Sequence, residues 1–413
     1  MTELWKMSSE ELLEGFECEC GKKHFSGLKV GLDRDIIEEC GSLVQNTGRV
    51  LLLDSFQAPT DYVDELHEKL EKHGYIIQRF APTSDDASGV ELVEGTILIL
   101  AIGGERIIER AKLLALSFNI PLIVLPTTLN LVRVKEGNSV LDYGGVRILR
   151  PSHKPDKILL YSEIFQKMDV DIFASVYAEL YSKTIALCDY VYKGCVKGEF
   201  CYYLSRAVLK LYRKINGLGI PKTQEGFRVF LEQAVKLNAL LSCENIEEGG
   251  EGQLATTLER YTGDRERKKL PRGEVLFLSS VIVGKVYSKF LERELPYGVH
   301  DLYGDWQKME SLMSVGDKEL ANFVYDDNYK YRDYKMKLTK DEVLSVCREV
   351  DDILQSATGV VKRIFRDGGF HLRYYLTAQE MLFLLPLSPV YLVGETLLGF
   401  IKERGLLNIA KNI

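Results

Sequence analysis

A regular alternation of strand and helix patterns between residues 49 and 125 constrains this chain more than any other feature. Short apolar runs, of the length of buried strands, alternate there with stretches whose apolar residues recur every three or four positions. The expected strands are 49–54, 75–80, 96–102 and 121–125, and the expected helices are 61–73 and 106–118. Because strands separated by helices pair in parallel, the sequence predicts an α/β domain built on a parallel sheet.

After about residue 165 the strand signals fade and long helical patterns take over. The expected helices are 176–196, 200–215, 223–242, 254–261, 274–294 and 340–352. At 413 residues the chain is longer than one hydrophobic core usually serves. We therefore expect a nucleotide-binding type α/β domain at 1–165 and an all-α domain at 166–413. The default ligand site of such a plan is the cleft between the domains.

The charge pattern indicates a small-molecule partner. The net charge is −7, and no stripe rich in Lys and Arg stands out, which argues against nucleic-acid binding. The apolar segment 381–401 is interrupted by Pro386, Pro389 and Glu395, so it predicts a turn between two buried helices rather than a membrane span. Eight scattered cysteines and an acidic, amphipathic start favour reduced thiols in a cytoplasmic protein.

The first 27 residues predict a short helix and then a turn or hairpin that leads into the first strand. Cys18, Cys20 and His24 place three soft metal ligands within seven residues. A structural zinc site needs four ligands, and no partner pair follows nearby. Plain reduced cysteines are therefore the favoured interpretation, and the start of a metal site is the alternative.

Six segments of distinct composition follow one another in a characteristic order. They are 101–112, which carries Gly-Gly after a strand, 121–128, which ends in Pro-Thr-Thr, 178–190, 249–259, 270–275 and the tail 397–407. Their order and spacing, with Cys-Glu-Cys-Gly at 18–21, resemble the sn-glycerol-1-phosphate dehydrogenases. That family belongs to the iron-containing alcohol dehydrogenase superfamily, which has a dehydroquinate synthase-like fold.

The resemblance implies an oxidoreductase that uses NAD(P) and a divalent metal, which polarises the substrate alcohol for hydride transfer. By position, it assigns cofactor contacts to Asp54, Gly103, Gly104, Thr127 and Thr128, catalytic roles to Glu179, Lys183 and Arg272, and a metal-ligand role to Glu179. It also implies a small phosphorylated or polyol ligand and a homo-oligomer.

Two of the family's three metal ligands are replaced in this chain. Gly252 and Arg272 stand at the two positions where the family's segments carry metal-binding histidines. Glu179 stands at the position of the family's acidic metal ligand. One interpretation is that Arg272 substitutes electrostatically for the metal cation and pairs with Glu179 or Glu251. The alternative keeps Arg272 as a clamp for a phosphate or carboxylate, which its planar fork of donors suits.

The nucleotide segments also depart from the family pattern. Glu105 replaces the third glycine of the loop, Glu109 replaces a shorter acid, Val132-Arg133 replaces an Asp-Gly pair and Tyr161 replaces an aspartate. A carboxylate beside a diphosphate adds repulsion where backbone amides and a helix N-terminus offer positive potential. We therefore expect weak NAD(P) binding unless Arg106 or another cation compensates.

Other family-like positions are open to two interpretations. Lys112, Lys183 and Asp189 are either cleft residues, with Lys183 as a cation for a phosphate, or structural residues of their helices. His300 and His371 match no motif, and either supplies a candidate metal ligand from another element.

Three functional hypotheses follow. The first is a glycerol-1-phosphate dehydrogenase homologue with impaired or repurposed chemistry. The second is an active NAD(P)-dependent polyol-phosphate dehydrogenase whose metal is held by Glu179 and a non-motif histidine. The third is a non-catalytic phosphate-ligand sensor or a partner of an intact paralogue.

Overall fold

The computed structural model describes residues 3–55, 58–80, 92–143, 146–197, 201–263, 272–292 and 340–364, together with Leu384, Thr396 and Leu398. The chain divides into two compact units. The sheet unit comprises Met1–Leu141, Ile148–Val176 and Gly217–Asn245, and the helical unit comprises Asp142–Arg147, Tyr177–Asn216 and Ile246–Ile413. Each unit is described separately below.

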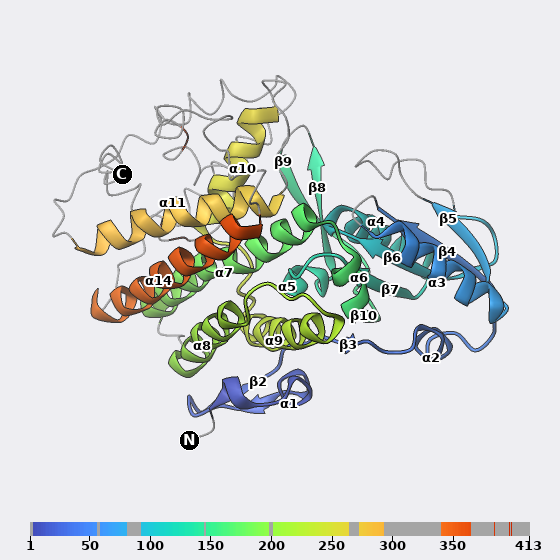
Figure 1. Cartoon of the computed structure of the whole chain (residues 1–413), viewed down its shortest axis with the longest axis horizontal. Helices are drawn as coiled ribbons and strands as arrows, with labels where there is room; N and C mark the ends of the chain where they lie inside the picture. The colour runs from blue at the N-terminus through green and yellow to red at the C-terminus, as the bar shows by residue number, and fades with distance from the viewer. Residues whose placement is uncertain are drawn as a thin grey trace. The chain divides into compact units, whose positions relative to one another are not determined.

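A six-stranded parallel sheet forms the centre of the sheet unit, as the sequence predicts (Figure 1). Its strand order is β3-β10-β7-β6-β4-β5. The strands are β3 (Val30–Leu32), β4 (Arg49–Asp54), β5 (Ile76–Phe80), β6 (Thr96–Gly103), β7 (Leu122–Pro126) and β10 (Lys157–Leu160). The four predicted strands β4 to β7 are confirmed, whereas β10 was not predicted. Leu51, Leu52 and Leu53 of β4 are fully buried, which explains the unbroken apolar run.

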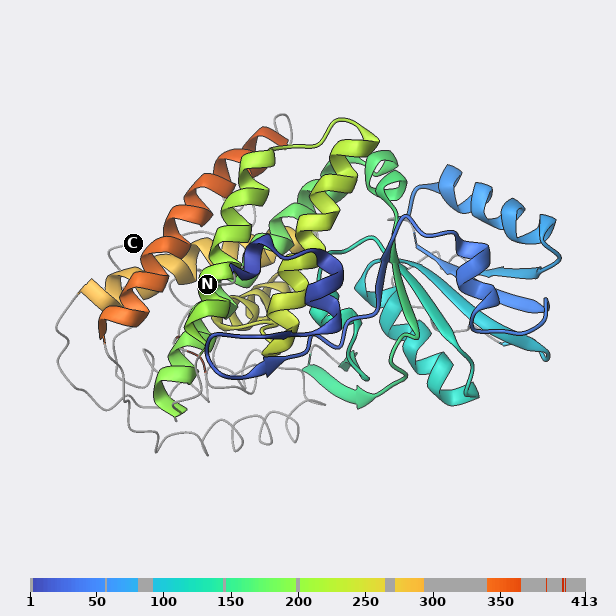
Figure 2. The ribbon, with the colours of Figure 1, turned by 90° about the horizontal axis from the view of Figure 1, so that it is seen from below.

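Helices α3 (Thr60–Lys72) and α4 (Glu105–Phe118) lie on opposite faces of this sheet (Figure 2). Each buries one apolar stripe at helical spacing. In α3 the buried residues include Val63, Leu66 and Leu70, and in α4 they include Ile108 and Ala111. Both helices were predicted, and each structural boundary lies within one residue of the predicted one.

The strand order reverses direction between β4 and β6. From β4 the chain passes through α3 to β5 on one side, and then crosses back to β6 on the other side of β4. In open parallel sheets, ligands bind at the carboxyl ends of the strands beside such a switch point. The loops that follow β4, β6 and β7 are therefore the first place to look for a ligand site in this unit.

The chain has further elements before, between and after the strands of this sheet. They are η1 (Leu4–Lys6), α1 (Ser9–Glu14), β1 (Phe16–Glu17), β2 (Lys23–His24), α2 (Ile36–Gly41), α5 (Leu131–Val134), β8 (Asn138–Tyr143), β9 (Val146–Pro151), α6 (Ser162–Lys167) and α9 (Gln224–Cys243). The predicted helix and hairpin near the start correspond to α1 and the β1–β2 pair. Ser8 caps α1 through a reciprocal capping box with Glu11.

The helical unit is built from long helices. These are α7 (Val170–Lys197), whose first residues belong to the sheet unit, α8 (Tyr202–Leu218), α10 (Gly250–Gly263), α11 (Arg272–Glu292) and α14 (Lys340–Ile364). Figure 1 shows α11 and α14 side by side, and Tyr181, Tyr212 and Tyr287 are fully buried in the core of the unit. The expected all-α second half is thereby confirmed for the described residues.

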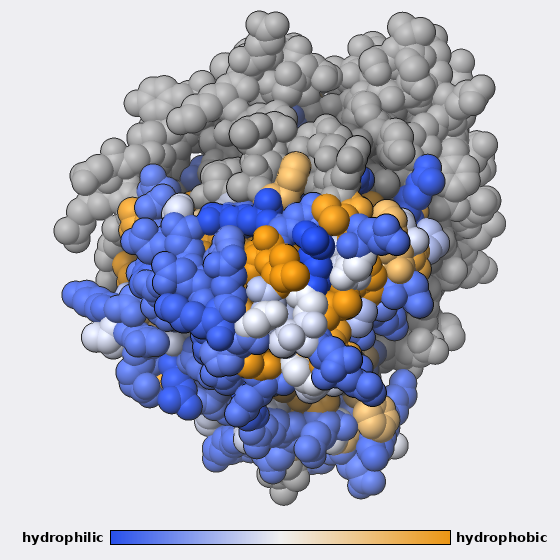
Figure 3. Space-filling model, turned by 90° about the vertical axis from the view of Figure 1, so that its right-hand side faces the viewer, coloured by the Kyte–Doolittle hydropathy of each residue, from blue (hydrophilic) through white to orange (hydrophobic). Residues whose placement is uncertain are grey.

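Several predictions fall on other parts of the chain. The turn expected at 381–401 and the closing helix at 397–407 lie outside the described residues, apart from Leu384, Thr396 and Leu398. His300 and His371 lie outside them as well. Within the described part of the chain, no helix is long and apolar enough to cross a membrane. Figure 3 shows a face on which hydrophilic side chains predominate and apolar ones form small patches.

Candidate functional site

The predicted cofactor-binding residues lie at one edge of the parallel sheet. Asp54 ends β4, Gly103 ends β6, and Thr127 and Thr128 directly follow β7. These three strands are neighbours in the sheet, and their ends are joined by backbone hydrogen bonds from Ser55 to Ile102 and from Thr127 to Gly103. The structure therefore brings the five predicted residues, including Gly104, to the same edge.

Gly103 and Gly104 form the turn between β6 and α4. Gly103 has φ +151°, and a Cβ atom there would overlap Ser55 Oγ, so the position requires glycine. Gly104 is the N-cap of α4 and carries no side chain that would occupy the helix end. The first backbone N–H groups of a helix point toward such an end and attract anions. The turn has the form of a diphosphate-binding loop.

Two buried oxygens at this edge have no hydrogen-bond partner among the described residues. They are Thr127 Oγ1 and Asp54 Oδ1, and both side chains are buried. The other carboxylate oxygen of Asp54 accepts bonds from Arg79 Nε at 3.2 Å and Nη2 at 2.8 Å. Since buried polar atoms are nearly always paired, these oxygens are candidates for ligand contact. Arg79 was not anticipated from the sequence.

Three of the departures from the family pattern in this unit, Glu105, Glu109 and Arg133, meet in one group of ion pairs. Arg133 Nε lies 2.7 Å from Glu105 Oε1 and 3.5 Å from Glu109 Oε1, and the Arg133 side chain is only 10% exposed. The carboxylate that replaces the third glycine is thus neutralised by the arginine that replaces the Asp-Gly pair. Arg133 provides the compensating cation for which the sequence suggested Arg106 or another residue.

Glu109 also contacts a second cation, Lys112, on the same helix. Lys112 Nζ lies 3.4 Å from Glu109 and donates to the Asn138 carbonyl at 2.7 Å. Burial is the main cause that raises the pKa of Glu109 and lowers the pKa of Lys112, and each partner opposes the shift of the other. These contacts favour the structural interpretation of Lys112, because its amine holds α4 to the start of β8.

In the helical unit, Glu179 and Lys183 occupy one face of α7. They are four residues apart and both are buried, with exposures of 7% and 2%. Lys183 Nζ has no hydrogen-bond partner among the described residues. A buried amine of this kind is available for an anion, and its charge also acts on Glu251 of α10.

Asp189, further along α7, has a structural role at the start of α10. Its Oδ2 accepts the Gly250 N–H at 2.7 Å, and its Oδ1 accepts the Tyr287 hydroxyl at 2.9 Å. A carboxylate at a helix N-terminus pairs with exposed N–H groups and with the helix dipole. A Cβ at Gly249 would overlap Asp189 Oδ2, which explains the glycine before the helix.

The positions of the two missing histidines are occupied by an ion-pair network. Arg272 Nη1 donates to Glu259 Oε2 at 2.6 Å, and Arg272 Nη2 lies 3.2 Å from Glu248 Oε2. A Cβ at Gly252 would meet the same Glu248 oxygen at 2.7 Å, so the Glu248 carboxylate fills the space left by the glycine. The sequence suggested Glu179 or Glu251 as partners of Arg272, and the structure pairs it with Glu248 and Glu259.

These residues do not fit the family's divalent metal. One carboxylate, Glu179, remains from the expected ligand set, Gly252 offers no donor atom, and Arg272 brings a fixed positive charge. Glu248, which lies against Gly252, is engaged with that arginine. A guanidinium held by two carboxylates thus stands at a position to which the resemblance assigns a metal ligand.

Glu251 is a strongly perturbed acid in the described part of this unit. It is fully buried and accepts the Gly249 N–H at 3.1 Å. Burial, followed by the repulsion of Asp189, raises the pKa of Glu251 to about 8, although Lys183 acts in the opposite direction. Burial therefore favours the neutral form of the Glu251 carboxyl.

Comparison with known proteins finds distant sequence similarity and a shared fold. No protein-family model matches the chain. A glycerol-1-phosphate dehydrogenase (NAD(P)+) from Methanosphaerula palustris is 23% identical over 236 residues, which cover 55% of this chain and 60% of that protein. This chain is distantly similar to the glycerol-1-phosphate dehydrogenases. The match covers less than two thirds of the relative's length.

Solved structures show the fold independently of sequence. An alcohol dehydrogenase from Oenococcus oeni superposes with a TM-score of 0.57 at 11% identity, covering 91% of this chain and 94% of that one. An iron-containing alcohol dehydrogenase from Corynebacterium glutamicum gives a TM-score of 0.52 at 12% identity, covering 93% and 94%. The fold of the chain is that of the iron-containing alcohol dehydrogenases.

Proposed function

We propose that this chain is a dehydrogenase-fold protein that binds a dinucleotide or a similar phosphorylated ligand and has lost metal-dependent alcohol oxidation. The observation that carries the proposal is the ion pair of Arg272 with Glu248 and Glu259 at the family's metal position. Similarity to a glycerol-1-phosphate dehydrogenase supports an oxidoreductase ancestry. The assignment of Glu179, Lys183 and Arg272 to the remaining site is part of this proposal.

The loss of the reaction follows from the charge and chemistry of the site. Alcohol oxidation in this family needs a Lewis acid that lowers the pKa of the substrate hydroxyl. A guanidinium has no empty coordination position, and Arg272 already donates to two carboxylates. Burial raises the pKa of Glu251, the buried acid of α10, to about 8, which disfavours its charged, proton-accepting form. The described residues of the helical unit therefore offer no group that activates an alcohol.

The sheet unit supports retained ligand binding. The Gly103–Gly104 turn would hold the diphosphate, and the buried Thr127 hydroxyl and Asp54 carboxylate would hold the remainder of the ligand. Arg133 removes the repulsion of Glu105 that would otherwise oppose the diphosphate. NAD(P), if bound, supplies a hydride acceptor, and these residues bind and orient it.

The test measures binding and turnover together. NADH and NADPH are titrated into the purified chain by calorimetry, and glycerol-1-phosphate oxidation is assayed with Zn²⁺, Ni²⁺ or Fe²⁺ added. We expect saturable nucleotide binding that is lost in Gly103→Val, is kept in Gly217→Ala, and is accompanied by no turnover. Gly217 is a suitable control because a Cβ there meets no atom within 4 Å.

Two results would sink the proposal. Metal-stimulated oxidation of glycerol-1-phosphate would establish the hypothesis of an active enzyme with an atypical metal site. Absence of nucleotide binding in the wild-type chain would contradict the proposal that ligand binding is retained. The hypothesis of a structural partner of another protein would then remain.

A further inference from the structure

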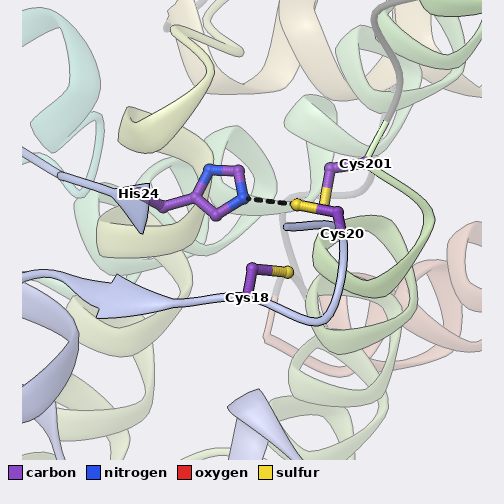
Figure 4. Close-up of side chains that lie close together, drawn as sticks. All are labelled: Cys18, Cys20, His24 and Cys201. Atoms are coloured by element: carbon purple, nitrogen blue, oxygen red, sulfur yellow. Dashed lines mark hydrogen bonds between the residues drawn. The ribbon is translucent and has the colours of Figure 1, made fainter. Parts of the chain in front are cut away.

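Two cysteines and one histidine form a compact group near the start of the sheet unit. The group consists of Cys18, Cys20 and His24, and one ligand atom from each lies within 4.8 Å of the other two. Figure 4 shows the His24 imidazole directed at the Cys20 sulfur, with Cys18 on the same hairpin. Cys18 and His24 are buried, and Cys20 is partly exposed. All three residues belong to one compact unit, so their grouping is a property of that unit alone.

The β1–β2 hairpin brings the three residues together. The Cys18 N–H donates to the Lys22 carbonyl at 3.0 Å, and the Gly21 N–H donates to the Cys18 carbonyl at 2.9 Å. Gly21 has φ +81°, a conformation that glycine adopts without strain, so the chain turns back sharply between Cys18 and Lys22. His24 then pairs with Phe16 across the hairpin. The three side chains therefore meet through local backbone structure.

The two ring nitrogens of His24 have different partners. Nδ1 lies 3.1 Å from Oε1 of Glu244, the C-cap residue of α9 in the same unit, while Nε2 lies 3.2 Å from Cys20 Sγ. A carboxylate on one nitrogen holds the proton there and leaves the lone pair of the other nitrogen for a metal, as is usual for ligating histidines. Phe16 packs against the ring at 5.4 Å between centroids. Glu244 is therefore a positioning residue, which acts through the imidazole.

Cys243 of α9 lies near this group but is not part of it. Its Sγ donates to the Ala239 carbonyl at 3.2 Å within its own helix. Burial is the main cause that raises the pKa of Cys243 to about 12, and the charge of Cys18 acts in the same direction. A thiol of this kind is inert, because the thiolate is the form that binds metals. Cys243 is therefore a matched control for the two cysteines of the hairpin.

We propose that Cys18, Cys20 and His24 bind one Zn²⁺ ion. Both cysteines are thiols, and as thiolates they would neutralise the double positive charge of zinc, while the imidazole adds a neutral nitrogen. Buried ligands can then hold the ion without leaving an unbalanced charge in the protein interior. Three protein ligands are enough for zinc, because a water or another small ligand can take the fourth position.

The spacing of the three ligand atoms suits zinc. Zn–S bonds of about 2.3 Å and a Zn–N bond of about 2.0 Å place tetrahedral ligand atoms roughly 3.5–3.8 Å apart. The ligand atoms of the group lie within 4.8 Å of one another, and Cys20 Sγ lies 3.2 Å from His24 Nε2. Small rotations of the side chains therefore reach the zinc geometry without a change in the hairpin backbone.

Cobalt substitution tests the site and its ligands together. The metal-stripped, reduced chain is titrated with Co²⁺, which reports tetrahedral thiolate ligation through visible and near-ultraviolet absorption. We expect thiolate bands that saturate at one Co²⁺ per chain and disappear when Zn²⁺ displaces the cobalt. In Cys20→Ser the Co²⁺ affinity should fall more than about 100-fold, because loss of a ligand costs more than loss of a group behind a ligand. Cys243→Ser should bind Co²⁺ as the wild type does.

The role of Glu244 is tested in the same titration. Glu244→Gln should lower the Co²⁺ affinity by about 10- to 100-fold and keep the thiolate bands, because the ligands remain and only the partner of His24 Nδ1 changes. The matched control is Glu17→Gln, which neutralises an exposed carboxylate on the same hairpin and should leave the affinity unchanged. Equal affinity in Glu244→Gln and wild type would contradict the positioning role.

A second measurement needs no variant and therefore does not depend on whether a variant folds. The wild-type chain is loaded with one equivalent of Zn²⁺, and the surroundings of the zinc are measured by X-ray absorption spectroscopy. We expect at least two sulfur atoms at about 2.3 Å and an imidazole nitrogen at about 2.0 Å from the zinc.

Several outcomes would overturn the zinc proposal. These are octahedral Co²⁺ without thiolate bands, equal Co²⁺ affinity in wild type and Cys20→Ser, or zinc surrounded by oxygen and nitrogen atoms alone. None of these outcomes bears on the loss of metal at Arg272, so the two proposals stand or fall separately.

Discussion

Removal of the Arg272 charge is the perturbation that most directly probes the ion-pair network of the helical unit. In Arg272→Met, the carboxylates of Glu248 and Glu259 lose a cation at 3.2 Å and 2.6 Å. The methionine retains much of the apolar stem, so the change is mainly one of charge. Arg272→Lys is the matched control, because it keeps the charge and loses only the two-pronged geometry.

The expected loss of stability lies between those of surface and buried pairs. Unit charges about 3 Å apart attract by roughly 5 kcal/mol at an effective dielectric constant near 20, but desolvation of the charges offsets most of this attraction. Side-chain exposures are 19% for Arg272, 12% for Glu248 and 32% for Glu259. Surface pairs contribute about 0–1 kcal/mol and breaking buried pairs costs about 3–5 kcal/mol, so we expect about 2 kcal/mol for Arg272→Met.

The assay is urea unfolding at pH 7 followed by circular dichroism. Arg272→Met should lower the free energy of unfolding by about 2 kcal/mol, and Arg272→Lys should lower it by about half as much. The double variant Arg272→Met/Glu248→Gln should be more stable than Arg272→Met alone, because it no longer leaves the Glu248 charge without its cation. A change below about 0.5 kcal/mol in Arg272→Met would refute the reasoning, because the network would then be no more than a surface ion pair.

Three further predictions follow from other contacts. Because the pKa of Glu251 is raised to about 8, the folded chain holds a proton that the unfolded chain releases above about pH 5, so stability should fall by about 1.4 kcal/mol per pH unit between pH 5.5 and 7.5 relative to Glu251→Gln in urea unfolding. Arg133→Met should weaken NADH binding at least about tenfold in calorimetry, and adding Glu105→Gln should restore it; an unchanged affinity in Arg133→Met would contradict the compensation. Gly249→Ala should destabilise the chain by more than about 2 kcal/mol in thermal unfolding because its Cβ overlaps Asp189, and stability equal to wild type would show that the α10 start adapts.

The parallel sheet and its two flanking helices were predictable because their signals are local. The apolar run at 49–54 and the 3.6-residue periodicity at 106–118 each specify one element without reference to the rest of the chain. The strand β10 was missed because Lys157–Leu160 is short and begins with a charged residue. Its place in the sheet comes from pairing with β3 and β7, which no local pattern reveals.

The site residues were predictable one by one, whereas their pairings were not. Sequence order identified Glu105 and the replaced Asp-Gly pair as separate departures, and the structure joins them through Arg133. In the same way, Glu248 had no motif to mark it, and it became relevant only through its position beside Gly252.

The most direct test of the central claim, that a guanidinium replaces the metal, is the metal content of the Cys18→Ser/Cys20→Ser variant. This variant removes two thiols that can hold a metal elsewhere in the chain and leaves Glu179, Gly252 and Arg272 intact. After incubation with Zn²⁺, Ni²⁺ and Fe²⁺ and exhaustive buffer exchange, elemental analysis should find no stoichiometric metal. One metal ion per chain in this variant, lost again when Glu179→Gln is added, would contradict the account.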